Sequence, residues 1–223
     1  DHELRINNRG DRPENRMENL AQYFRDIFDL NKDKKNFRIF SPDESESNSL
    51  NTMFSVTDRA YLWPTKSWDK YISADGRIME ILSEHVLEEW MQGYNVTGRY
   101  GVLISYEAFL NIISSQVDQY IKYIKQSKEI SWRKPIPGLN LISTSTLWRQ
   151  EHNGFSHQNP SLINSLLAKN AEYVKIYFPA DVNTLLVTIE ECLKSKNTVN
   201  LIVACKRDIP QWLNIEEAKK DVD

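Results

Sequence analysis

Short apolar segments alternate along this chain with segments whose apolar residues recur at helical spacing. The apolar segments cover residues 37–40, 78–82, 101–105, 139–142, 174–178 and 199–205. Helical periodicity fills most of the chain between them, at residues 15–30, 84–94, 109–124, 161–169 and 183–194. This alternation predicts an α/β fold, in which helices cover both faces of a mostly parallel sheet.

The loops that follow the apolar segments are where a ligand site is expected. The carboxyl ends of parallel strands meet at one edge of a sheet, and ligands bind beyond that edge. We therefore expect one shared rim for the polar loops after Phe40, Leu82, Ile142, Phe178 and Cys205.

The length of 223 residues suits one domain with a short extension. Residues 1–14 are charged and contain Gly and Pro, which predicts a linker or arm before a domain at 15–223. Residues 55–75 hold four aromatic residues and one proline without a period, and we expect them to be irregular. Because the chain starts at Asp1 without an initiator Met, we expect it to be a fragment of a longer protein.

Composition narrows the class of partner. A net charge of -3 gives no reason to expect binding to nucleic acid or to an anionic membrane surface. No apolar run approaches the roughly 20 residues that span a bilayer. Cys192 and Cys205 each lie in an apolar segment, which favours reduced thiols and a cytoplasmic protein.

One polar stretch has no amphipathic period to explain it by packing: Leu147-Trp148-Arg149-Gln150-Glu151-His152-Asn153-Gly154-Phe155-Ser156-His157-Gln158. His152 and His157 beside Glu151 suggest metal ligands, but the spacing is loose and a further ligand is not obvious, so no metal site is predicted. The chain has no Gly-x-Ser-x-Gly elbow and no glycine-rich phosphate loop. The stretch is therefore a candidate site without an assigned chemistry.

Four other residues have both a structural and a functional interpretation. Glu84 follows Ser83, a natural N-cap. Its carboxylate either stabilises the helix N-terminus by interacting with the helix dipole or exchanges a proton with a ring nitrogen of a ligand. Lys206 is either a surface lysine with an apolar stem, which we favour, or an anion-binding point charge. Tyr106 and Phe109 are expected in a helix core with Ile112 rather than as a platform for a planar ring.

Several stretches, taken together, resemble the middle domain of phosphoketolases, which are thiamine-diphosphate enzymes. They lie at residues 36–44, 47–48, 80–85, 97–101, 105–109, 132–135, 148–158 and 181–183. The resemblance extends in order from about Leu20 to Ala218, and the run Trp-Arg-Gln-Glu-His-Asn-Gly-Phe-Ser-His-Gln is its most specific part.

The resemblance implies the pyrimidine-binding module of the cofactor fold. Glu84 matches the glutamate that hydrogen-bonds the aminopyrimidine and promotes its imino tautomer. Tyr106 and Phe109 match the lining of the pyrimidine pocket. The resemblance places a further group around the sugar phosphate or the reacting intermediate, with His157 also catalytic: Ser47, Gln150, Asn153, His157 and Lys206. His152 lies in the same loop and is expected to share these polar contacts with the substrate.

The reaction implied is cleavage of xylulose 5-phosphate or fructose 6-phosphate by inorganic phosphate to acetyl phosphate, water and a shorter aldose phosphate. The resemblance also implies a homodimer, and a separate N-terminal domain that binds the diphosphate and its Mg²⁺, so the isolated domain should be inactive. Ser49 stands where the family pattern has an Arg, which removes a bidentate phosphate contact. That departure motivates an alternative, a non-catalytic phosphoketolase-like binding or regulatory domain.

Overall fold

A computed structural model describes the chain except residues 1, 11, 150–153, 155 and 223. Its centre is a seven-stranded sheet in which every strand pairs parallel to its neighbours, in the order β3-β4-β2-β5-β6-β8-β7. The strands are β2 (Phe37–Ser41), β3 (Arg59–Ala60), β4 (Ile78–Glu80), β5 (Tyr100–Tyr106), β6 (Leu139–Thr144), β7 (Val174–Tyr177) and β8 (Val199–Val203). The predicted α/β fold with a parallel sheet is confirmed.

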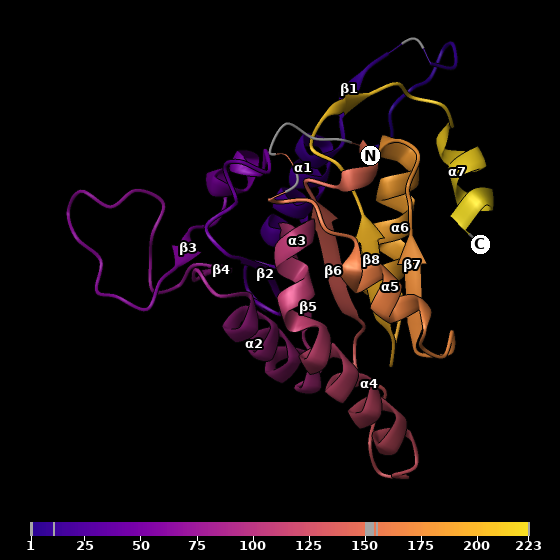
Figure 1. Cartoon of the computed structure of the whole chain (residues 1–223). Coiled ribbons are helices and arrows are strands. Elements are labelled where there is room, and N and C mark those ends of the chain that lie inside the picture. Colours follow the sequence, from indigo (N-terminus) through magenta and orange to yellow (C-terminus); the bar gives the residue numbers. More distant parts are fainter. Residues whose placement is uncertain (1, 11, 150–153, 155, 223) are drawn as a thin grey trace.

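Helices cover both faces of this sheet (Figure 1). They are α1 (Arg16–Leu30), α2 (Glu84–Val96), α3 (Glu107–Leu110), α4 (Ser114–Lys128), α5 (Ser161–Leu167), α6 (Val182–Lys194) and α7 (Ile215–Val222). Short 3-10 turns are η1 (Asn51–Ser55), η2 (Asn111–Ile113) and η3 (Leu147–Arg149). The single helix predicted after Tyr106 is wrong in one respect, because η2 divides it into α3 and α4.

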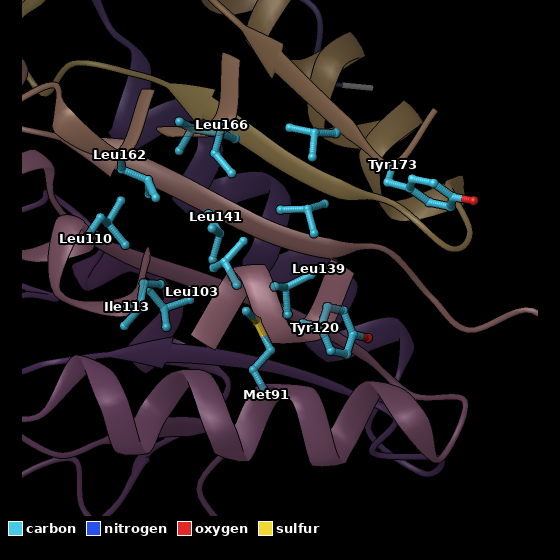
Figure 2. Close-up of a cluster of buried hydrophobic side chains, with 14 of the residues drawn as sticks. Met91, Leu103, Leu110, Ile113, Tyr120, Leu139, Leu141, Leu162, Leu166 and Tyr173 are labelled. Carbon is cyan, nitrogen blue, oxygen red and sulfur yellow. The ribbon is translucent and has the colours of Figure 1, made fainter. Parts of the chain in front are cut away.

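Two apolar cores lie on opposite faces of the sheet, because successive strand residues point to opposite sides. On one face, side chains of α1, η1 and α6 pack against strand residues such as Ile39, Val102 and Ile142. On the other, α2, α4 and α5 pack against residues such as Leu103 and Leu141. Figure 2 shows part of this second cluster. A sheet buried on both faces leaves only its edges for chemistry.

The start of α2 is built as the sequence indicates, but β4 is shorter than predicted. Ser83 caps the helix, with its Oγ accepting a hydrogen bond from the backbone N–H of Val86 at 3.4 Å. β4 ends at Glu80, and Leu82, predicted as the end of a buried strand, is 82% exposed. The backbone leaves the sheet early because it must turn into the cap of α2.

The N-terminal segment is attached to the domain by hydrogen bonds. The backbone of Leu4 exchanges hydrogen bonds with the Asn183 side chain of α6, at 2.8 and 2.9 Å. β1 (Glu14–Asn15) pairs antiparallel with β9 (Asp208–Ile209).

Residues 55–75, which were predicted to be irregular, contribute β3 at the sheet edge and then project away from it (Figure 1). Within the described part of the chain, no helix is both long and apolar enough to cross a membrane.

Candidate functional site at the carboxyl edge of the sheet

The carboxyl ends of all seven strands lie at one edge of the sheet, because all pairings are parallel. The loop after β2, the start of α2 after β4, and the segments after β6 and β8 leave the sheet there. The predicted shared rim is therefore confirmed for these loops. A cluster of polar and aromatic side chains occupies it.

Tyr106, the last residue of β5, is the centre of this cluster. Its hydroxyl lies 2.6 Å from the Ser47 Oγ, in the loop after β2. Its ring centroid is 5.8 Å from that of Phe109 and 5.1 Å from the His157 ring, and the Lys206 Nζ lies 4.4 Å from it. Segments that follow β2, β5 and β8, far apart in sequence, thus meet around the Tyr106 ring.

His157 is held in place by the first turn after β5. Its carbonyl oxygen accepts a hydrogen bond from the backbone N–H of Ala108 at 3.1 Å. Its Nδ1 lies 2.8 Å from the Ser156 Oγ, and its ring centroid is 5.3 Å from that of Phe109. The imidazole therefore has a fixed position beside the two aromatic rings.

Glu84 is the first residue of α2 and is half-buried. Its Oε1 accepts a hydrogen bond from the Ser105 Oγ at 3.1 Å, so its side chain points toward the end of β5. The partial positive charge at the helix N-terminus favours a carboxylate in this position. The two interpretations of Glu84 are compatible, since the helix terminus also orients the carboxylate toward the cluster.

Two interpretations of the sequence are corrected by the structure. Lys206 is not a surface lysine: it is 8% exposed, and its Nζ lies over the Tyr106 ring. Tyr106 is a strand residue rather than a helix residue, and Ile112 is 45% exposed, so neither belongs to a helix core. Both corrections enlarge the cluster at the edge.

Glu44 belongs to the cluster and was missed by the sequence reasoning. It is 6% exposed, and its Oε2 accepts a hydrogen bond from the backbone N–H of Tyr106 at 3.1 Å. Burial raises the pKa of Glu44 to about 8, and the charge of Glu84 adds to this effect. The Tyr106 N–H, Lys206 and the Asn48 side chain oppose it. The available signal was its place in the Ser41-Pro42-Asp43-Glu44 stretch, but sequence alone does not show burial.

Several buried polar atoms near the ends of β2 and β6 have no hydrogen-bond partner within the described residues. They are the Ser41 Oγ, the Ser143 Oγ and the Thr146 Oγ1. Unpartnered buried atoms of this kind also occur elsewhere among the described residues, for example at Arg16, Arg59 and Asn200, so they do not by themselves mark a ligand site.

Part of the predicted site lies outside the described residues, namely Gln150, His152 and Asn153. The structure brings together the other predicted site residues: Ser47, Glu84, Tyr106, Phe109, His157 and Lys206. Among the residues it describes, no group of three or more His, Cys, Asp or Glu side chains is placed to hold a metal ion.

Fold and cluster define an α/β domain with a polar, aromatic ligand site at the carboxyl edge of a parallel sheet. Residues 18–195 match the family model described as D-xylulose 5-phosphate/D-fructose 6-phosphate phosphoketolase, and the chain belongs to that family. A probable phosphoketolase of Brucella suis is 47% identical over 201 residues, covering 90% of this chain and 26% of that protein. For one of Nitrosospira multiformis, the identity is 48% over 198 residues, covering 89% and 24%.

Solved structures show the same fold at low identity. A transketolase from Pichia stipitis superposes with a TM-score of 0.72 at 16% identity, covering 97% of this chain and 29% of that one. A transketolase from Leishmania mexicana gives a TM-score of 0.67 at 16% identity, covering 96% and 28%. In the sequence comparison, the chain spans about a quarter of the length of the curated phosphoketolase relatives it matches.

Proposed function

We propose that this chain is the pyrimidine-binding domain of a thiamine-diphosphate-dependent phosphoketolase. The complete enzyme would cleave xylulose 5-phosphate or fructose 6-phosphate with inorganic phosphate, giving acetyl phosphate, water and a shorter aldose phosphate. The observation that carries the proposal is Glu84, a carboxylate at a helix N-terminus that points toward Tyr106 and its aromatic neighbours. Family membership supplies the reaction class.

The residues present fit the pyrimidine part of the cofactor. A planar, polar ring needs a carboxylate for its ring nitrogen and flat apolar walls, which Glu84, Tyr106 and Phe109 supply. For the diphosphate and Mg²⁺, we propose a separate domain of the complete protein, and an inactive isolated chain.

Thiamine diphosphate, when bound, supplies the carbanion chemistry of the reaction. Glu84 would hold a proton at the pyrimidine nitrogen, while the Ser105 hydroxyl keeps its carboxylate oriented. His157 would move a proton at the sugar. Lys206 and Ser47 would bind the anionic substrate, with Gln150, His152 and Asn153 proposed for the same role. The buried Lys206 is suited to this, since a desolvated ammonium interacts strongly with an anion.

The proposal is tested with the complete natural protein, thiamine diphosphate, Mg²⁺ and each ketose phosphate. We expect acetyl phosphate to form only when cofactor, sugar phosphate and inorganic phosphate are all present. Light scattering of the same sample tests the proposed homodimer. Cofactor-independent formation of acetyl phosphate, or none with any ketose phosphate, would contradict the catalytic proposal.

The second candidate is a non-catalytic phosphoketolase-like domain, and Ser49 favours it. Ser49 lies in the turn beside Asn48 with a backbone φ of 59°. Its short hydroxyl side chain cannot form the bidentate hydrogen bonds that a guanidinium makes to a phosphate. Calorimetry separates the two candidates. Binding of thiamine diphosphate without binding of ketose phosphate favours the non-catalytic domain, and binding of both favours the enzyme.

A further inference from the structure

Glu44 is a buried carboxyl group that the chemistry proposed above does not use. Its loop leaves β2, turns at Asp43 with a φ of 61°, and brings the side chain beneath the backbone N–H of Tyr106. Glu84 from α2 and Lys206 from the segment after β8 are the charged side chains that act most strongly on it. His157 packs against the Tyr106 ring. Asp43 and Glu46, which lie on the same loop as Glu44, are exposed.

Two glutamates thus share one desolvated edge with one lysine. Ionising both would place two like charges close together where water is scarce, which is unfavourable. The surroundings of the two differ. Glu84 is half-buried and has the N-terminus of a 13-residue helix and the Ser105 hydroxyl to stabilise a negative charge. Glu44 is only 6% exposed, so desolvation outweighs the Tyr106 N–H, the Asn48 side chain and Lys206, which favour its charged form. A single negative charge is therefore better placed on Glu84.

We infer that Glu44 is a positioning residue of this site, which keeps a proton beside Glu84 so that the pair carries one negative charge and Glu84 bears it. The inference rests on the proposed function, since it assigns Glu84 the charge that meets the pyrimidine. The burial of Glu44 and its bond to Tyr106 are independent of that function. The raised pKa of Glu44, about 8, agrees with a proton retained at neutral pH.

The direct test is infrared spectroscopy of the complete protein without ligand at pH 7, comparing wild type with Glu44→Gln. A protonated carboxyl absorbs apart from a carboxylate, so the difference spectrum should contain one carboxylic-acid band that disappears as pH rises through about 8. Glu46→Gln, an exposed neighbour on the same loop, should lose a carboxylate band instead. A carboxylate band lost in Glu44→Gln would overturn the inference.

The second test is calorimetric titration with thiamine diphosphate and Mg²⁺ between pH 7 and pH 9. In wild type, affinity should fall about tenfold as Glu44 ionises, because binding then closes the site over a second charge. Glu44→Gln should remove that decline, and Glu46→Gln should keep it. An unchanged decline in Glu44→Gln, or a variant that does not fold, overturns the inference, since a neutral amide should replace a neutral carboxyl. If wild type binds no cofactor, the proposed function fails, while the infrared test still decides the protonation of Glu44.

Discussion

Two of the regions that bury carboxyl groups in this domain differ in what surrounds those groups. The edge cluster contains Glu44, Ser47, Glu84, Tyr106, His157 and Lys206. The α2–α4 seam contains Glu88, Gln92, Asn95 and Tyr120. Burial raises the pKa of Glu44 to about 8 and that of Glu88 to about 7.

The comparison shows that a raised pKa alone does not identify a functional carboxyl. In the seam, Glu88 is fully buried beside an apolar core, and its main polar partner is Gln92 of its own helix. In the edge cluster, Glu44 is close to a second carboxylate, a lysine and an aromatic ring, contributed by different elements. Functional importance is therefore expected at the edge, and effects on stability alone in the seam.

The largest expected effect is that of Glu84→Gln on turnover. The amide cannot hold the proton at the pyrimidine nitrogen, so acetyl phosphate production by the complete protein should fall about 10²–10⁴-fold. Glu89→Gln, exposed on the same helix, is the matched control and should retain wild-type rates. Normal production by Glu84→Gln would show that the assigned role is wrong.

The next effect concerns the seam and is one of stability. The pKa of Glu88 is raised from 4.5 to about 7 in the folded protein, so the folded state holds a proton that the unfolded state has released in that range. The free energy of unfolding should therefore fall as pH rises from 4.5 to about 7. Glu44 and Glu80, whose pKa values are raised to about 8 and about 7, act in the same direction.

Glu88→Gln tests this with urea unfolding at pH 5 and pH 8. Between these two pH values, the free energy of unfolding of the variant should fall by on the order of 2 kcal/mol less than that of wild type. Its catalytic rates should be unchanged. Loss of catalysis with unchanged stability would remove the distinction between the two regions.

A smaller effect is expected for Lys206→Gln. Removing a buried cation from the edge cluster should weaken ketose phosphate binding about tenfold, measured as an increase in KM. Lys175→Gln, at an exposed position of β7, controls for the loss of one positive charge. Equal KM values in the two variants would show that Lys206 does not contact the substrate.

The smallest effect is the coupling between Ser47 and Tyr106. A double-mutant cycle with Ser47→Ala and Tyr106→Phe, measured by thermal unfolding, should give an interaction energy of about 1 kcal/mol for their hydrogen bond. Strict additivity would indicate that the 2.6 Å contact contributes nothing net.

The features that local sequence determines could be predicted. Alternating apolar segments indicated the parallel sheet, and Ser83 indicated the start of α2, because periodicity and capping act over a few residues. The resemblance indicated Ser47, Tyr106 and Lys206, which the structure brings together.

The features that depend on tertiary contacts could not be predicted. Glu44 lies on a loop with positive φ angles at Asp43 and Ser49, and although Asp tolerates that conformation, neither residue specifies it. Lys206 is buried with its Nζ over the Tyr106 ring, which nothing in its neighbouring residues indicates. The pairing of β1 with β9 joins segments almost 200 residues apart, beyond the reach of any local pattern.

The most direct test of the edge cluster is a crystal structure of the complete protein with thiamine diphosphate and Mg²⁺ bound. We predict a hydrogen bond between the Glu84 carboxylate and the pyrimidine ring, with Tyr106 and Phe109 lining the ring and Glu44 beside Glu84. A pyrimidine bound elsewhere, with Glu84 facing only Ser105 and its own helix, would contradict the assignment of this edge as the cofactor site.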